Sequence, residues 1–201
     1  MLVFSQVKRR TGAEDEGRDA VAGISSRLGR SGGRAARTWA WRCPDQPCNH
    51  VIMETLYEHA GGEEGLRRFI EIFYRSLLAD PLLQPLFGTG KASHVDNLTA
   101  FTAETFGGPD TFSAEMGGFP LLIDAHRGLR IEEAQRLRFV ELYMLAADTA
   151  GLPADEPFRA SLRSHVEFGT QVALQNSHAD TDDQLHPLRE VPIWEWEQPP
   201  R

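Results

Sequence analysis

The sequence lacks most of the features that mark secreted, membrane-spanning or covalently cross-linked proteins. It has two cysteines in 201 residues, Cys43 and Cys48, which does not imply a disulfide framework. No apolar run approaches the ~20 residues that a membrane-spanning helix needs. The N-terminal segment also lacks the apolar core of a signal peptide. We therefore expect a cytoplasmic protein without a membrane span.

Positive charge is scarce outside the N-terminal segment. The formal net charge is -8, which argues against a general nucleic-acid binder. Residues 1–50 hold nine Lys or Arg and five Asp or Glu, whereas residues 51–201 hold twelve and 24. The basic, Gly-rich stretch of residues 29–34 predicts that residues 1–52 form a disordered leader. Our hypothesis is that Met53 is the true start; the alternative is a genuine basic arm.

Hydrophobic periodicity predicts an all-α domain over residues 53–176. Apolar residues at i, i+3, i+4, i+7 and i+11 predict a helix from residue 63 to the Asp80-Pro81 step. A second helix is expected over about residues 93–105, with Ser93 as its cap and Gly107-Gly108-Pro109 beyond its end. The stripe of the first helix consists of Leu66, Phe69, Ile70, Phe73 and Leu77.

The C-terminal half predicts two further long helices. Residues 110–123 are Gly-rich with scattered large apolar side chains, and we expect a loop packed on the core. Helices are expected over residues 131–150 and 156–176, separated by the breaker Gly151-Leu152-Pro153. We expect residues 177–201 to form an acidic tail. In an extended strand, Trp194 and Trp196 would point the same way. The two tryptophans would then dock on the globular domain or on a partner. The third long helix should face inward with Leu137, Val140, Met144 and Ala147.

The order of aromatic residues, histidines and glycines narrows the fold further. Leu56-Tyr57-Glu58-His59-Ala60-Gly61-Gly62 opens the domain, and Phe73-Tyr74, Pro85-Leu86-Phe87, His94, Gly107-Gly108-Pro109 and Asp124-Ala125-His126 follow. Together these motifs resemble the truncated haemoglobins, most closely their second group, over about residues 54–175. Helix count alone fits an ordinary four-helix bundle equally well. The resemblance implies a two-over-two helical sandwich with a disordered leader before it and an extended tail behind it.

The resemblance also implies a haem b site with His126 as the proximal iron ligand. A neutral imidazole is a common iron ligand. Arg130, four residues later, would pair with a haem propionate, or else is a solvated arginine. Phe87 matches a position that wedges the haem, and Phe139 one where the second group usually has tryptophan.

On the distal side, the resemblance directs the hydroxyl of Tyr74 at the iron-bound ligand. The alternative is a core tyrosine whose hydroxyl reaches solvent. His94, Leu98 and Phe101 stand at i, i+4 and i+7 and share one helical face, which the resemblance places over the iron. His94 would hydrogen-bond the ligand, gate access or coordinate the iron; a solvent-facing role is its alternative.

Three functions remain open at this point. The first is reversible binding of dioxygen, nitric oxide or carbon monoxide, for delivery, storage or sensing. The second is enzymatic, with nitric oxide dioxygenase or peroxidase-like detoxification that depends on a separate reductase, since no flavin or nicotinamide motif is present. The third is a haem-free helical interaction module, which only the Trp-rich tail favours.

Overall fold

The computed structural model describes residues 54–187 and 190–196, and the regular secondary structure in these ranges is entirely helical. The predicted leader, residues 1–52, and the proposed start at Met53 lie outside the described residues. Four helices are long, namely α2 (Gly62–Ala79), α4 (Ala92–Thr105), α7 (Glu133–Thr149) and α8 (Glu156–Ser177). The short helices are α1 (Leu56–His59), α3 (Gln84–Phe87), α5 (Thr111–Glu115), α6 (Gly118–His126) and the 3-10 turn η1 (Asp182–Gln184).

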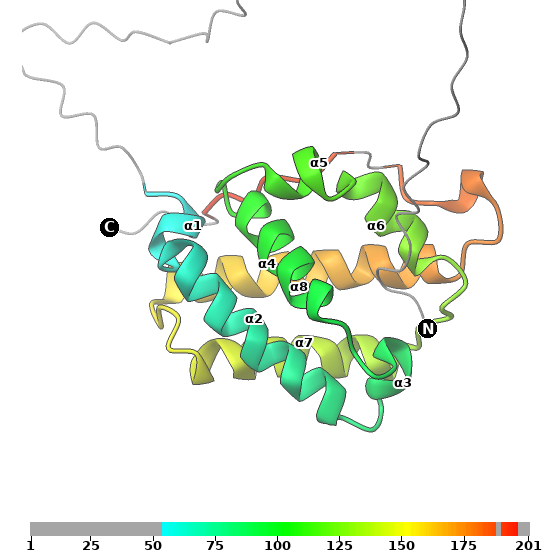
Figure 1. The fold of residues 1–201 in the computed structure, drawn as a ribbon, viewed down its shortest axis with the longest axis horizontal. Coiled ribbons are helices and arrows are strands. Elements are labelled where there is room, and N and C mark those ends of the chain that lie inside the picture. Colours follow the sequence, from blue (N-terminus) through cyan, green and yellow to red (C-terminus); the bar gives the residue numbers. More distant parts are fainter. Residues whose placement is uncertain (1–53, 188–189, 197–201) are drawn as a thin grey trace, which may run out of the picture. The chain divides into compact units, whose positions relative to one another are not determined.

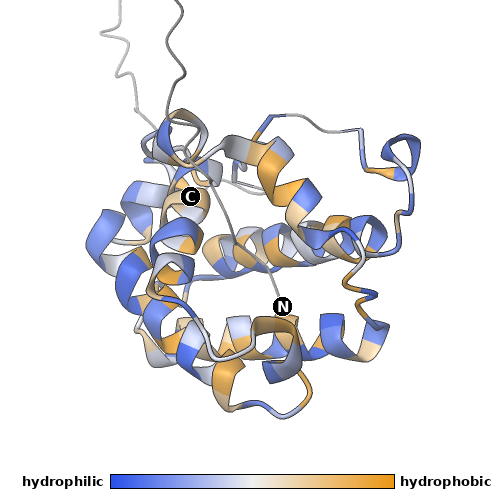
Figure 2. Ribbon diagram, turned by 45° about the vertical axis from the view of Figure 1, so that its right-hand side comes forward, coloured by the Kyte–Doolittle hydropathy of each residue, from blue (hydrophilic) through white to orange (hydrophobic). Residues whose placement is uncertain are grey.

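The long helices form two crossed pairs. Helix α2 packs on α4, α7 packs on α8, and α2 crosses α7 to join the pairs (Figure 1). Hydrophobic residues gather on the inward sides of the helices, and hydrophilic residues lie outside (Figure 2). This arrangement confirms the predicted all-α, two-over-two sandwich.

The apolar stripe of α2 forms the centre of the core. All five of its predicted members, from Leu66 to Leu77, are fully buried. The rings of Phe69 and Phe73 meet the Tyr143 ring of α7 edge-on, with centroid distances of 4.7 and 5.1 Å. Burying side chains of this size stabilises the fold by about 1.5–3 kcal/mol each. The crossing of α2 and α7 is therefore an aromatic contact that the sequence stripe specifies.

Glycines form the tight corners before α2 and after α4. Gly61 precedes α2 with φ +87°, and Gly107 follows α4 with φ +82°, both in the left-handed region that favours glycine. A Cβ on Gly108 would lie 2.7 Å from the Tyr57 ring and 2.8 Å from the carbonyl oxygen of Ala103. These corners therefore need glycine for both conformation and space.

The predicted loop over residues 110–123 is wrong. Two short helices, α5 and α6, occupy this stretch and meet at Gly117, whose φ is +91°. Phe119, Leu122 and Ile123 are spaced at i, i+3 and i+4, a helical pattern that the glycine content obscured. The predicted cap Ser93 is also wrong, because α4 begins after Lys91 and Ser93 lies in its first turn.

Helix α7 presents a face different from the predicted one. Val140 and Ala147 are buried as expected, but Leu137 is 54% exposed. The inward face follows Phe139, Val140 and Tyr143 instead, because α7 must cover both the α2 stripe and the side of α8. A helix that contacts two neighbours buries a wider arc than a single apolar stripe predicts.

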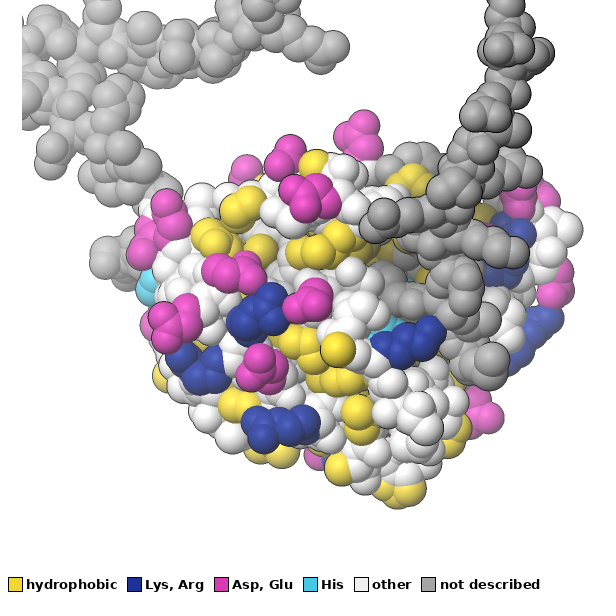
Figure 3. Space-filling view, viewed as in Figure 1, with side chains coloured by type: hydrophobic (Ala, Val, Ile, Leu, Met, Phe, Trp, Pro, Cys, Tyr) yellow, Lys and Arg dark blue, Asp and Glu magenta, His cyan; other side chains and the backbone are white. Residues whose placement is uncertain are grey.

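The described surface mixes charges of both signs. On the face that carries α2 and α4, acidic and basic side chains alternate with small apolar areas (Figure 3). Arg67, for example, pairs with Asp96 of α4 at 2.9 Å. Within the described ranges, no helix has the length and apolar character required to cross a bilayer.

Candidate functional site

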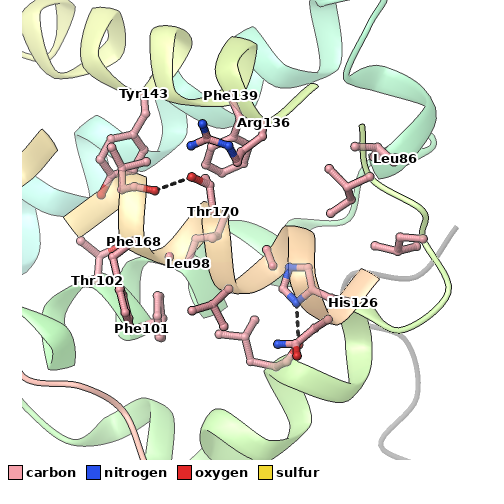
Figure 4. A pocket seen from close by; sticks show the side chains of 18 of the residues that line it. Leu86, Leu98, Phe101, Thr102, His126, Arg136, Phe139, Tyr143, Phe168 and Thr170 are labelled. Atoms are coloured by element: carbon pink, nitrogen blue, oxygen red, sulfur yellow. Dashed lines mark hydrogen bonds between the residues drawn. The ribbon is translucent and has the colours of Figure 1, made fainter. Parts of the chain in front are cut away.

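One cavity, lined mainly by aromatic and aliphatic side chains, lies among α4, α6, α7 and α8. Figure 4 shows its wall, with Leu98, Phe101 and Thr102 from α4, His126 from α6, Arg136, Phe139 and Tyr143 from α7, and Phe168 and Thr170 from α8. Such a chamber, apolar with a few polar groups, is typical of a small-molecule or cofactor site. Of the eight predicted site residues, six line it: Phe87, His94, Leu98, Phe101, His126 and Phe139.

His126 is the last residue of α6, and its ring points into the cavity, opposite Phe139 and Arg136 (Figure 4). Its Nδ1 lies 2.7 Å from the carbonyl oxygen of Leu122, one helical turn earlier. A carbonyl only accepts, so Nδ1 carries the proton and Nε2 keeps a bare lone pair. Burial lowers the pKa of His126 and favours this neutral form. The ring is therefore set up as a metal ligand oriented by its own helix.

His94 and Tyr74 form a buried pair on the opposite side. The Tyr74 hydroxyl lies 2.5 Å from Nδ1 of His94 and accepts the backbone N–H of Lys91 at 3.0 Å. Among the described residues, Nδ1 of His94 is the acceptor within reach of the Tyr74 O–H. Tyr74 therefore donates its hydroxyl proton to Nδ1. The His94 proton then sits on Nε2. Burial, with a smaller contribution from the charge of Lys91, lowers the pKa of His94 and keeps it neutral.

Tyr74 itself is not part of the cavity wall. It is 5% exposed and packs edge-on against Phe87 and His94, with centroid distances of 6.2 and 5.5 Å. The alternative of a hydroxyl that reaches solvent does not describe this residue, nor does a solvent-facing role describe His94, which is 3% exposed. The hydroxyl of Tyr74 hydrogen-bonds Nδ1 of His94, and it is His94 that lines the cavity.

Arg130 does not line the cavity, although its neighbours Leu129 and Ile131 do. It has an unusual φ of +51°, and its guanidinium hydrogen-bonds Asp180 at 2.5 Å beyond α8. Arg136 of α7, which sequence analysis did not single out, lines the cavity instead. Its side chain is 14% exposed and is held by Glu133, with Nε 2.9 Å from both carboxylate oxygens. Arg136, Phe139 and Tyr143 follow an i, i+3, i+7 pattern, which was the available signal.

Helix α8 contributes a wall that sequence analysis missed. His165, Phe168 and Thr170 line the cavity, and His165 is 7% exposed. Thr105 donates its hydroxyl to the carbonyl of Thr102, so Nε2–H of His165 donates to that hydroxyl at 3.3 Å. Nδ1 of His165 has no hydrogen-bond partner among the described residues. Burial lowers the pKa of His165 to about 4, and the ring is neutral.

Comparison with known proteins assigns the family. Residues 55–168 match the model of the bacterial-like globins. The chain belongs to the bacterial-like globin family. Family membership implies a haem cofactor and small diatomic ligands.

Solved globin structures agree with this assignment. The haemoglobin of Chloroflexus aurantiacus is 33% identical over 60% of this chain and 98% of its own, with a TM-score of 0.55. A thermostable haemoglobin from Thermobifida fusca is 30% identical over 60% and 97%, with a TM-score of 0.54. The group II truncated haemoglobin of Bacillus anthracis, 22% identical over 69% and 99%, has the same fold with a TM-score of 0.56.

The curated proteins give a shorter match. A group 1 truncated haemoglobin from Tetrahymena pyriformis is 26% identical over 80 residues, or 39% of this chain. The chain spans 62% of the length of that relative. The resemblance of the sequence to truncated haemoglobins is thereby confirmed.

The residues of this globin fit a haem. The cavity presents one imidazole with a bare Nε2, which is the ligand that haem iron takes from a globin helix. Its remaining wall is mainly aliphatic and aromatic, as a porphyrin requires, and Arg136 offers a cation to a propionate. No group of three or more His, Cys, Asp or Glu within residues 54–187 and 190–196 forms a competing metal site.

Proposed function

We propose that this globin holds haem iron through Nε2 of His126 and binds dioxygen and other diatomic gases on the side of His94. Bound haem iron supplies reversible coordination of such gases and one-electron redox chemistry. The chain supplies orientation, polarity and exclusion of water. The haem type, haem b, remains part of this proposal.

The observation that carries the proposal is a complementary pair of imidazoles on one cavity. In both rings Nδ1 is engaged, by the Leu122 carbonyl in His126 and by the Tyr74 hydroxyl in His94. The first contact leaves Nε2 as a lone pair, and the second leaves Nε2 as an N–H donor. One ring is thus suited to a metal and the other to a polar ligand.

His94 would stabilise a ligand that carries partial negative charge on its outer atom. An N–H donor would favour dioxygen over carbon monoxide, because carbon monoxide would carry less negative charge on its outer atom when bound to iron. Phe87 and Phe139, which line the cavity, present no hydrogen-bond donor to it. His94 therefore becomes the principal distal donor in this proposal, with Tyr74 as its positioning residue.

Arg136 would hold a propionate of the haem at the cavity wall. Its guanidinium already forms a bidentate pair with Glu133, which fixes the head group and leaves further N–H donors. This role takes the place of the one predicted for Arg130, whose guanidinium is engaged by Asp180.

The absorption spectra of the haem-supplied protein test this function. Ferric, ferrous and carbon monoxide-treated samples should show haem bands, with a five-coordinate ferrous spectrum that shifts on carbon monoxide. A six-coordinate ferrous spectrum that disappears in His94→Ala would assign His94 as an iron ligand and contradict its role as donor. A protein that takes up no haem would contradict the proposal and favour the interaction-module alternative.

A further inference from the structure

The C-terminal strap, residues 190–196, lies beyond the family match and crosses the globin domain. In Figure 1 it is the red segment that runs behind α5 and α4 towards α1. Trp194 donates its backbone N–H to the carbonyl of Thr105, the last residue of α4, at 2.6 Å. Trp196 donates Nε1–H to the carbonyl of Glu54 at 2.7 Å. Val191, 9% exposed, packs into the cluster around Phe112 and Phe119 of α5 and α6.

The strap forms part of the cavity wall. Pro192 lines the cavity directly. The indole of Trp194 meets the ring of His165 edge-on at 5.8 Å and the ring of Phe168 at 5.4 Å, and both of these residues line the cavity. Trp194 therefore lies immediately outside the inner wall of α8, and Pro192 lies within the wall.

The strap lies over the seam between α4 and α8, two helices that pack little against each other. Helix α4 packs mainly on α2 and α5, whereas α8 packs mainly on α7 and α6. The link between α4 and α8 at this end is made by side chains, with His165 against Thr105 at 3.3 Å and against the ring of Phe101 at 6.3 Å. At this seam, the indole of Trp194 packs edge-on against the ring of His165.

The chemistry of the seam defines what can pass through it. Its walls are the rings of Phe101, Phe168 and Trp194 and the neutral imidazole of His165, and no charged side chain belongs to this group. A hydrated ion would lose its water there without gaining a partner. Small uncharged molecules, dioxygen, nitric oxide and carbon monoxide among them, carry no such penalty.

We propose that Trp194 and Pro192 control the access of small uncharged ligands to the cavity through the seam between α4 and α8, with Trp194 closing the opening over His165. The identity of the ligands rests on the proposed function, whereas the route rests on the strap and the cavity alone. Two measurements separate these claims.

The first measurement is the carbon monoxide association rate after flash photolysis of the haem-loaded ferrous protein. Trp194→Ala should raise the association rate about tenfold, which corresponds to a barrier lower by ~1.4 kcal/mol. The rate of Trp194→Phe should lie between those of Trp194→Ala and the parent protein. Ile193→Ala is the matched control, because Ile193 belongs to the same strap but is 58% exposed. A parental rate in a folded Trp194→Ala protein would overturn the inference.

The second measurement needs no iron. Xenon exchange with the full-length, haem-free protein is followed by ¹²⁹Xe NMR, with helix content checked by circular dichroism. Exchange should be faster in Trp194→Ala than in Ile193→Ala. If no variant takes up haem but this difference persists, the proposed function fails and the access route stands. If haem and carbon monoxide bind normally but neither rate changes, the access route fails alone; Trp194→Phe decides the matter if Trp194→Ala does not fold.

Discussion

The two sides of the cavity are built from unequal parts of the fold. His126 ends a nine-residue helix that follows the left-handed Gly117 and precedes Gly128 and Arg130, both at positive φ. Tyr74 stands on α2, an 18-residue helix that supplies much of the buried core, and His94 stands on α4, a 14-residue helix packed against α2. The distal donor is therefore pre-organised by the core, whereas the proximal ligand depends on a short, marginal element.

This difference indicates where the haem itself contributes to the structure. A short helix with few buried residues opens at low free energy, and a ligand that binds only its closed form stabilises it by mass action. In α6, Gly118, Phe119 and Ile123 are buried. We therefore expect cofactor binding to order the proximal side far more than the distal side.

Loss of the proximal ligand should have the largest effect. His126→Ala removes the Nε2 lone pair, and because Arg136 and the apolar wall alone hold a porphyrin weakly, we expect no stable haem complement. The absorption spectrum after gel filtration of the haem-supplied protein measures this. His178→Ala is the control, since His178 is exposed and does not itself line the cavity. Full haem retention in His126→Ala would refute the ligand assignment.

Hydrogen exchange should show the next largest effect. Without haem, amides of α6 should open at only about 1–3 kcal/mol, near the low end of the range for local opening, whereas those of α2 should approach the global value. Haem should protect α6 strongly and α2 little. Hydrogen-exchange mass spectrometry measures the amide protection of both helices together, once in the haem-free protein and once in the haem-loaded protein. Equal amide protection of α6 and α2 without haem would contradict the proposed difference in local stability between the two helices.

The difference between long core helices and the short helix α6 also explains which features could be predicted from the sequence. Helices α2 and α8 carry apolar stripes on long, uninterrupted segments, and glycine pairs and prolines mark their ends, so local patterns determine them. The six predicted residues that line the cavity stand at positions that the resemblance supplies. The helices were therefore predictable from local patterns, and the six cavity positions from the resemblance.

The remaining features either have weak local patterns or depend on contacts distant in sequence. Helix α6 is short and begins and ends near glycines, so its periodicity was too brief to outweigh its composition. Arg130 bonds Asp180 after α8, a contact fifty residues away that no local pattern reveals. The strap reaches Thr105 and Glu54 through backbone carbonyls, which leave no trace in the sequence. Arg136 was missed because a cation in an apolar wall resembles a surface residue.

Tyr74→Phe should have a smaller effect, and it distinguishes two distal roles. Loss of the hydroxyl leaves Nδ1 of His94 and the N–H of Lys91 without this partner, which should cost about 1–3 kcal/mol of unfolding free energy. With the His94 tautomer no longer fixed, dioxygen dissociation should quicken about fivefold, the equivalent of ~1 kcal/mol. Urea unfolding and stopped-flow dissociation of the haem-loaded protein measure the two effects.

A double-mutant cycle completes this test. If Tyr74 acts through His94, Tyr74→Phe should leave the dissociation rate unchanged once His94→Leu is present. An equal effect in both backgrounds would show that the hydroxyl contacts the ligand directly. Tyr57→Phe is the control, because its ring packs on the Gly62 and Gly108 corners away from the cavity.

The smallest effect concerns the end of the distal side that is remote from the cavity, where His59 joins α1 to α8. Its Nε2 lies 2.8 Å from Asp155 and its Nδ1 3.2 Å from Glu54, and Trp196 packs edge-on against the ring at 4.9 Å. Burial alone would lower the pKa of His59, but the hydrogen bonds and charges of these carboxylates raise it above its ordinary value of 6.5. Protonation is therefore favoured in the folded state.

The sign of the pH dependence follows from this shift. The contribution of His59 is fully present below about pH 6.5, the unfolded pKa, and is lost as the pH rises through the higher folded pKa. His94, His126 and His165 have lowered pKa values and act in the opposite sense, because their contributions are lost as the pH falls. The difference in unfolding free energy between the parent and His59→Gln isolates the first effect. It should be larger at about pH 6 than at about pH 9; a difference that grows with pH would show that His59 is neutral in the fold.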